Sequence, residues 1–246
     1  MRKYKKNLVN VLHLQKKSIM KTLFYILFSA FLLIFVSCQR ESSEDVNQDK
    51  IYTEYSLVYD ANTDITYARA LFKFSNITGT QLELKAPAEV KFDNDILAFN
   101  QTLAYYEKQY VGVKTGGTFT YKDLDNNTFT NTITGVKSIG FPTGLDSIHK
   151  SSSYQMVWVG DSLITGEGVT VTINGINEGD AQIFYTNSVN ANSITFPLNK
   201  LQLLGTGSGT MFMQRDITKT LQQATSAGGY IKGVYKPANL PIQIAN

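Results

Sequence analysis

The residue with the most distinctive chemistry in this sequence is Cys38, the only cysteine among 246 residues. A thiol can act as a nucleophile, bind a metal, form a disulfide or carry a lipid. Cys38 lies just after a 14-residue apolar run, residues 23–36, and just before a polar, charged segment. As a helix that run spans about 21 Å, which is short of the roughly 30 Å hydrocarbon core of a bilayer. The run therefore predicts the apolar part of a signal peptide rather than a transmembrane helix.

The four residues Phe35-Val36-Ser37-Cys38 resemble the lipobox of bacterial lipoproteins, and the acidic stretch that follows, residues 39–50, resembles the export signals of Bacteroidetes lipoproteins. A small residue precedes the cysteine, as in that family, but Phe35 stands where the family prefers Leu. The resemblance implies that residues 1–37 are a cleaved signal peptide and that Cys38 is acylated with palmitate-like chains. Two or three such chains, at roughly 0.8 kcal/mol per buried CH2, would hold the protein on a membrane. The alternative is an ordinary cysteine beside a membrane anchor or a conventional secretory signal.

The leader is longer than a signal requires. Met20 and Lys21, followed by the apolar run and the lipobox, form a complete signal by themselves. We hypothesise that translation starts at Met20.

Cleavage changes the charge of the protein. Seven of the 23 Lys and Arg residues and none of the 20 Asp and Glu residues precede Cys38. The mature chain therefore has 16 basic against 20 acidic residues, so its net charge is −4 instead of +3. Nucleic acid is not expected as a partner, because phosphate binding needs a positively charged face.

Few side chains remain for catalysis. Without the leader, His149 is the only histidine, and the acylated Cys38 offers no thiol. Cysteine–histidine nucleophiles and sites with two histidines are therefore excluded. His149 lies beside Lys150 and three serines and is interpreted as a solvated loop residue. Hydrolysis by paired carboxylates is kept as a minor alternative, so the sequence favours a non-catalytic protein without a cofactor.

One segment has the ligand types of a calcium loop. Asp123, Asp125 and Asn127 have oxygen-bearing side chains at alternate positions, but Thr128 replaces the glycine that an EF-hand needs. Thr134 stands where the bidentate glutamate belongs. A hairpin turn explains these residues more simply, and no metal is predicted.

Aromatic residues suggest a ligand-binding surface. Tyr105, Tyr106 and Tyr110 cluster in the sequence, where an exposed platform could stack on sugar rings. These three tyrosines are the candidate ligand-binding residues. The alternative is that they pack in a β-sheet core, as tyrosines often do. Trp158 alternates with Tyr154 and Met156 and is predicted to be in a core.

The fold class is all-β. Ala68, Ala70, Phe72 and Phe74 alternate with polar residues, and residues 169–174 alternate without interruption. Such patterns put one face of an antiparallel sheet on a core and the other in water. Only residues 216–224 have a short helical pattern, and residues 103–110 could be helix or strand.

Residues 51–246 are predicted to form two tandem immunoglobulin-like antiparallel β-sandwiches, 51–134 and 154–246, joined by a linker at 135–153. Residues 38–50 contain the lipidated cysteine and a predicted flexible, disordered tether, because the segment is almost entirely polar. Residues 79–84 with Pro87 and Val90-Lys91-Phe92 resemble immunoglobulin-like modules of bacterial surface proteins.

The sequence thus predicts a lipid-anchored protein of the cell envelope, in the outer membrane, that serves as a non-catalytic binding or structural module. Its expected partners are the membrane, through the lipid, and envelope proteins or glycans. The alternative is a surface glycan-binding lipoprotein of a polysaccharide-uptake system.

Overall fold

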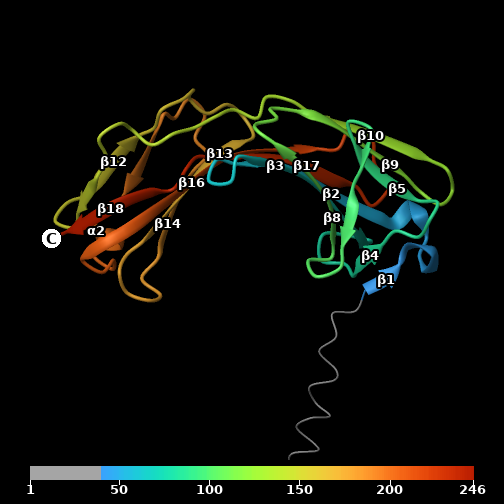
Figure 1. Ribbon diagram of the computed structural model, residues 1–246, viewed down its shortest axis with the longest axis horizontal. Helices are drawn as coiled ribbons and strands as arrows, with labels where there is room; N and C mark the ends of the chain where they lie inside the picture. The colour runs from blue at the N-terminus through green and yellow to red at the C-terminus, as the bar shows by residue number, and fades with distance from the viewer. Residues whose placement is uncertain (1–39) are drawn as a thin grey trace, which may run out of the picture. The chain divides into compact units, whose positions relative to one another are not determined.

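The computed structural model describes residues 40–246 (Figure 1). Cys38 and the predicted signal peptide lie outside the described residues. The described chain is nearly all-β. Its strands are β1 (Arg40–Ser42), β2 (Ile51–Asp60), β3 (Ile65–Phe74), β4 (Gln81–Glu83), β5 (Glu89–Phe92), β6 (Asp95–Ile96), β7 (Ala98–Asn100), β8 (Tyr105–Val111), β9 (Gly117–Lys122), β10 (Thr128–Ile133), β11 (Ser147–His149), β12 (Tyr154–Val157), β13 (Glu167–Asn174), β14 (Gln182–Thr186), β15 (Ser193–Phe196), β16 (Gly207–Thr220), β17 (Gly229–Lys236) and β18 (Leu240–Ala245). Short helices are η1 (Ser43–Asp45), η2 (Gln48–Lys50) and α2 (Leu198–Leu201). In this range no helix has the length and apolar character needed to cross a bilayer.

The long strands form where the sequence alternates. Ala68, Ala70 and Phe72 on β3 are buried, while Arg69, Leu71 and Lys73, which alternate with them, are only partly buried. Phe74, the last residue of the strand, is 37% exposed. Val169, Val171 and Ile173 on β13 show the same alternation. The predicted two-residue periodicity is confirmed in both strands.

One large sheet runs through the whole described chain. Its main path is β1-β4-β3-β2-β17-β16-β13-β14. The connection between the two halves is the parallel pair of β17 with β2, in which residues 229–236 lie beside residues 53–60. A smaller sheet, β10-β9-β5-β6, packs on one face of the β3-β2-β17 region (Figure 1).

Two hydrophobic cores pack against one face of this sheet. In the first, the ring of Tyr55 on β2 stacks on Phe119 of β9 with centroids 4.6 Å apart. The second core contains Trp158 and Phe196 with side chains of β13, β16 and β18, so the predicted core position of Trp158 is confirmed. Ile217 on β16 and Ile231 on β17 belong to the first core, although they come from the C-terminal half.

The predicted tandem arrangement differs from this topology. Residues 40–246 form one compact unit, because the first core is completed by β16 and β17. The predicted linker 135–153 is also folded: Val136 is buried in the first core, and Ile139 and Ile148 are buried in the second. β11, inside that linker, pairs in parallel with β18.

The segment predicted as a flexible tether is ordered from Arg40 onward. β1 pairs in parallel with β4, and η1 and η2 follow it. Gln48, 7% exposed, donates to the carbonyls of Ser43 and Val46 at 2.6 and 3.0 Å. Ser43 Oγ accepts the backbone N–H of Lys85 at 2.8 Å. Hydrogen bonds from side chains to the backbone thus satisfy these buried polar groups. The prediction of a disordered tether rests only on the low hydrophobicity of the segment and does not take such bonds into account.

The predicted helical pattern at 216–224 is also wrong. β16 continues as a strand to Thr220, and only turns and bends follow it up to Gly228. Of residues 103–110, for which both helix and strand are predicted alternatives, residues 103–104 lie in a turn and residues 105–110 belong to the strand β8.

A buried ion pair lies where the two cores meet on β16. Arg215 Nη2 is 2.5 Å from Glu167 Oε2, and the side chains are 2% and 1% exposed. The guanidinium also donates to the carbonyls of Asp161 and Ser162, at 2.8 and 3.1 Å. Glu167 in turn accepts the N–H of Ile164 at 2.9 Å. The pair therefore connects β13, β16 and the 161–164 loop.

Candidate functional site

The three predicted ligand-binding tyrosines do not form one platform. All three belong to β8, but adjacent residues of a strand point to opposite faces of a sheet. Tyr105 points to one face, whereas Tyr106 and Tyr110 belong to the other. Cys38, the predicted lipidation site, lies outside the described residues.

Tyr106 is a core residue. It is 7% exposed, and its ring packs against Phe99 and Phe72 at centroid distances of 4.9 and 5.7 Å. Its hydroxyl oxygen accepts the N–H of Leu84 at 2.7 Å. Burial raises the pKa of this phenol to about 12. Tyr106 cannot stack on a ligand, so its prediction as a binding residue is wrong.

Tyr110 is half-buried against the first core. Its hydroxyl donates to the carbonyl of Phe92 at 3.2 Å or to Asp95 at 3.0 Å, and the ammonium of Lys114 lies 4.5 Å from its ring centroid. Burial is the main cause of the raised pKa of the Tyr110 phenol, and the hydrogen bond to Asp95 raises that pKa further. Its hydroxyl and ring thus already have intramolecular partners.

Tyr105 lies on the other side of the large sheet, which we call the open face. This face is formed by the side chains of β8, β3, β2, β17, β16, β13 and β14 that point away from the two cores. Among residues 40–246 the smaller sheet packs only on the opposite side (Figure 1). Antiparallel sheets commonly leave one face in contact with solvent.

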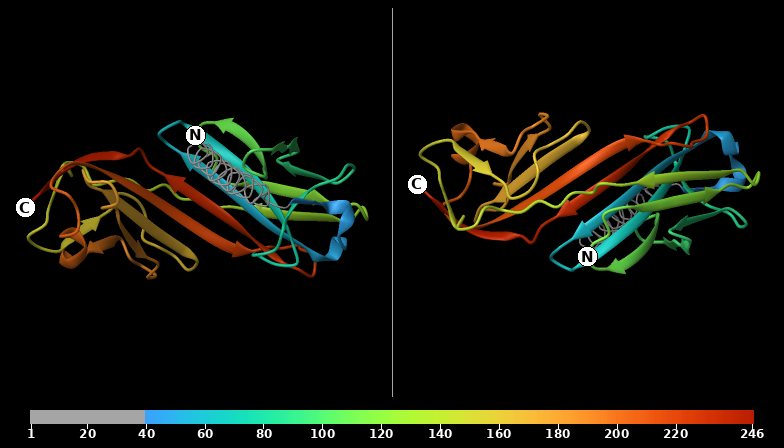
Figure 2. Two further views of the ribbon diagram at one scale, coloured as in Figure 1. Left: turned by 90° about the horizontal axis from the view of Figure 1, so that it is seen from below. Right: turned by 90° about the horizontal axis from the view of Figure 1, so that it is seen from above.

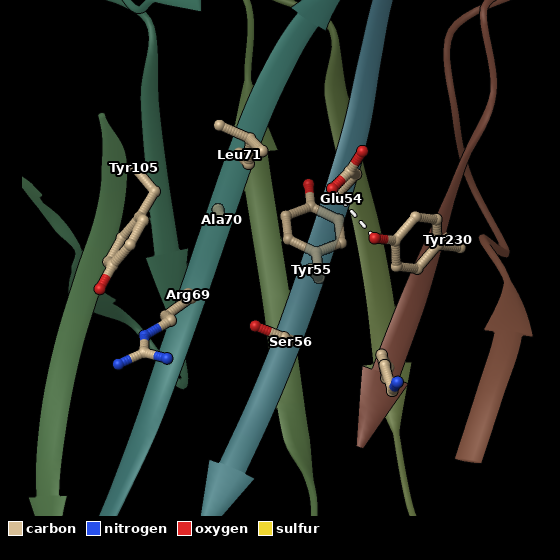
Figure 3. Close-up of a pocket in the computed structure, with 9 residues that line it drawn as sticks. Glu54, Tyr55, Ser56, Arg69, Ala70, Leu71, Tyr105 and Tyr230 are labelled. Carbon is tan, nitrogen blue, oxygen red and sulfur yellow. Dashed lines mark hydrogen bonds between the residues drawn. The ribbon is translucent and has the colours of Figure 1, made fainter. Parts of the chain in front are cut away.

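The open face has a shallow hollow around Tyr105 of about 160 Å³ (Figure 3). Side chains from four strands line it: Glu54 and Ser56 of β2, Arg69 and Leu71 of β3, Tyr105 of β8, and Tyr230 and Lys232 of β17. The strand register brings them together, because Ser56 pairs with both Arg69 and Lys232, and Glu54 with both Leu71 and Tyr230. The parallel β17–β2 pair is thus what completes the hollow.

The charges around the hollow are paired. Glu54 accepts the hydroxyl of Tyr230 at 2.9 Å and the ammonium of Lys73 at 2.7 Å. Arg69 Nε is 2.6 Å from Glu107 Oε2, and its guanidinium lies 5.1 Å from the Tyr105 ring centroid. These contacts hold the side chains in fixed positions, which lowers the entropic cost of binding a ligand.

The phenols of the hollow are hydrogen-bond donors. Burial, together with the carboxylate of Glu54, raises the pKa of Tyr230 to about 12. Burial also raises the pKa of Tyr105, although Arg69 opposes that shift. Both hydroxyls therefore stay protonated at neutral pH. The arrangement is suited to binding a polar ligand.

A second hollow of about 360 Å³ lies on the same face, over the other half of the sheet. It is lined by Thr170 and Thr172 of β13, Phe212, Met213 and Gln214 of β16, Lys236 of β17, and Asp60, Asn62 and Asn239. Beside it, Ile183 and Tyr185 of β14 are 58% and 59% exposed. The open face therefore offers apolar and polar groups along both halves of the chain.

The alternating pattern of β2 and β3 already indicates part of the open face. The residues between the buried positions of these strands, such as Glu54, Arg69 and Leu71, form the centre of that face. No local sequence pattern indicates that Tyr230 and Lys232 line the hollow, because their position there depends on the pairing of β17 with β2.

The other residues considered for chemistry, those of the loop 123–127 and His149, make contacts that belong to the fold. Asp123 is 1% exposed and caps the β9–β10 turn, where its carboxylate accepts the backbone and side-chain N–H groups of Asn127 at 2.8 and 3.0 Å. The hairpin interpretation of residues 123–127 is confirmed. His149 is exposed on β11, and its Nδ1 lies 3.4 Å from the carbonyl oxygen of Asn246. Residues 40–246 contain no group of three His, Cys, Asp or Glu side chains arranged to hold a metal ion.

No protein-family model and no curated protein matches the chain. Solved structures are similar at low identity. A structure of a 1.5-MDa bacterial ice-binding adhesin is 10% identical, with 81% of this chain and 67% of that chain covered and a TM-score of 0.23. The FN1–FN3 domains of chicken CNTN1 are 7% identical, covering 75% and 65%, with a TM-score of 0.22. The tandem V-type regions of the chitin-binding protein VCBP3 are 9% identical, covering 76% and 99%, with a TM-score of 0.20. These similarities assign no family.

Proposed function

We propose that this protein is a cell-envelope lipoprotein, held in the outer membrane by acyl chains on Cys38. The proposal is supported by the apolar run and lipobox that precede the folded chain. With residues 1–37 removed, the chain would be acidic, and its net charge gives no reason to expect a nucleic-acid partner.

We further propose that the protein is a non-catalytic binding module and that it binds its partner through the open face. The observation that carries this proposal is the continuity of that face. Both hollows and the exposed Phe212, Ile183 and Tyr185 lie on one side of one sheet. Uncovered surfaces that combine aromatic and polar groups are typical of interaction sites.

We regard each core as an immunoglobulin-like half, with the two halves sharing the large sheet instead of following one another as separate domains. The support is that each half has its own hydrophobic core. β16, which is 14 residues long, contributes to both.

A glycan is the second candidate for the ligand. The specific support is the set of aromatic rings on the open face, Tyr105, Tyr230 and Phe212, which line hollows that also contain amide, hydroxyl and charged side chains. Aromatic rings can stack on the apolar face of a sugar, and amides and hydroxyls can bond its hydroxyl groups.

The test uses variants of the open face with a control on the same strand. The Tyr105→Ala and Arg69→Ala variants are expected to lose the cross-links that the unmodified protein forms with envelope proteins in intact cells. For a glycan ligand, both variants are expected to lose the retardation that the unmodified protein shows in gels containing envelope polysaccharide. Lys108→Ala, an exposed position on the other side of β8, should leave both unchanged. Circular dichroism checks that the variants fold. Unchanged cross-links and unchanged gel mobility in both folded variants would contradict binding through this face.

A further inference from the structure

The folded part of the chain begins very close to the proposed lipid. Only Gln39 separates Cys38 from Arg40, the first residue of β1. Two residue steps span at most about 7 Å between Cα atoms. The headgroup layer on each side of a bilayer is of similar thickness, roughly 5–8 Å. Acyl chains on Cys38 would therefore bring Arg40 to the membrane surface.

We infer that the protein lies directly on the lipid surface, without a flexible spacer, and that the edge formed by β1, β4 and the turn at residues 101–104 contacts the headgroups. This inference rests on the proposed acylation of Cys38. It extends that proposal, because a lipoprotein with a long tether has no defined contact with the bilayer.

Arg40 is fixed to the folded chain. Its guanidinium donates to the backbone carbonyl of Gln101 at 2.6 Å and to the Gln101 side chain at 3.2 Å, and lies 5.6 Å from the ring centroid of Phe99. In β1, Arg40 also pairs with Gln81 of β4. The first residue after Gln39 therefore has side-chain and strand contacts.

The order continues from Arg40 to β2. Asp49 accepts the N–H of Ser226 at 2.9 Å, and Ser226 Oγ donates to the Asp49 carbonyl at 2.9 Å. Together with the buried Ser43 and Gln48, these bonds fix the whole segment 40–50. No stretch of this segment is free to act as a spacer.

The edge has a side chain suited to a lipid interface. Leu103 is 54% exposed on the turn that holds Arg40. Asn100 closes that turn, because its side-chain oxygen accepts the N–H groups of Thr102 and Leu103, both at 3.0 Å. An apolar side chain fixed in this position can enter the headgroup region.

The charge of the edge indicates what holds it there. Counted together with the adjoining η1 and Lys85, its charged residues are two basic and four acidic, a net charge of −2: Arg40, Glu41, Glu44, Asp45, Glu83 and Lys85. Attraction to anionic lipids therefore contributes nothing, and the acyl chains must provide the anchoring. We expect the contact to form on zwitterionic lipid and to be insensitive to salt.

The far end of the sheet provides the control position. β14 ends the main strand path that begins at β1. Both views in Figure 2 place the segment after Gln39 and the C-terminus at opposite ends of the described chain. Ile183 on β14 is 58% exposed, which matches the exposure of Leu103.

The experiment measures the proximity of both positions to headgroups. Acylation uses the only cysteine, so Leu103→Cys or Ile183→Cys introduces a single free thiol for a fluorophore. The acylated protein is reconstituted into phosphatidylcholine vesicles that carry a nitroxide on the headgroup. We expect quenching to be several-fold stronger at position 103 than at 183. A 20-residue Gly/Ser linker inserted after Gln39, with a reach of about 25 Å, should remove most of the difference.

Equal quenching at 103 and 183, in protein that floats with the vesicles, would overturn the inference and leave the proposed acylation intact. Strong quenching at 103 that the linker does not change would also overturn it, because the proximity would then not come from the short connection. Failure of the unmodified protein to float with the vesicles would instead contradict the proposed lipid anchor.

Discussion

Replacing Arg215 with methionine is expected to lower the free energy of unfolding by about 3–5 kcal/mol, because the change leaves a buried carboxylate without its charge partner. Glu167 is 1% exposed on its side chain and accepts the guanidinium at 2.5 Å. In the same variant the Ser162 carbonyl loses the guanidinium donor, and the Asp161 carbonyl keeps only the indole N–H of Trp158 at 3.2 Å. Urea denaturation of the purified protein from residue 40 onward measures the change.

Two further variants show whether the ion pair is responsible. Arg215→Met combined with Glu167→Gln removes both charges and should recover a large part of the loss, which indicates coupling between the two sites. Lys85→Met breaks the exposed ion pair of Lys85 with Glu44, whose side chains are 56% and 48% exposed. Exposed pairs contribute about 0–1 kcal/mol. An equal, small effect of Arg215→Met and Lys85→Met would contradict the structural role given to the buried pair.

Residues 51–134, expressed alone, are expected to remain unfolded. This fragment contains β2 and β3 but lacks β16 and β17, which provide Ile217 and Ile231 to its core. It also loses the partner strand that pairs with residues 53–60 of β2. The apolar face of β2 would then be incompletely covered, and its backbone groups would form an unpaired edge.

Proton NMR and amide hydrogen exchange distinguish the outcomes. The fragment should give poorly dispersed amide signals and no slowly exchanging amides, whereas residues 40–246 should give both dispersion and protection. The intact chain serves as the control for expression and buffer. A dispersed spectrum with protected amides from 51–134 would restore the tandem arrangement of separate domains.

The strands were predictable where burial alternates strictly. Phe72 on β3 and Val171 on β13 lie in such patterns, and both are buried as expected. The helical pattern at 216–224 rests on the spacing of Ile217, Leu221 and Ala224, but residues 216–220 continue the strand β16. The inward-facing row of β16 also contains Arg215, and its burial depends on Glu167, 48 residues earlier, and on two loop carbonyls, which nothing local in the sequence indicates.

Arrangement in space was harder to predict than the identity of the strands. The union of both halves depends on the parallel pairing of β17 with β2, which alternation cannot reveal. Likewise, Tyr105 and Tyr106 are neighbours in the chain but belong to opposite faces of the sheet. Of the tyrosine cluster, only Tyr105 lines a hollow of the open face.

Metabolic labelling with an alkyne analogue of palmitate, in cells that express the full chain, tests the lipid anchor itself. We expect a labelled protein in the membrane fraction that lacks residues 1–37. A Cys38→Ser variant should be unlabelled and leave that fraction. An unlabelled wild-type protein, or a Cys38→Ser variant that fractionates with the membrane as before, would contradict the lipid anchor on which the proposed function depends.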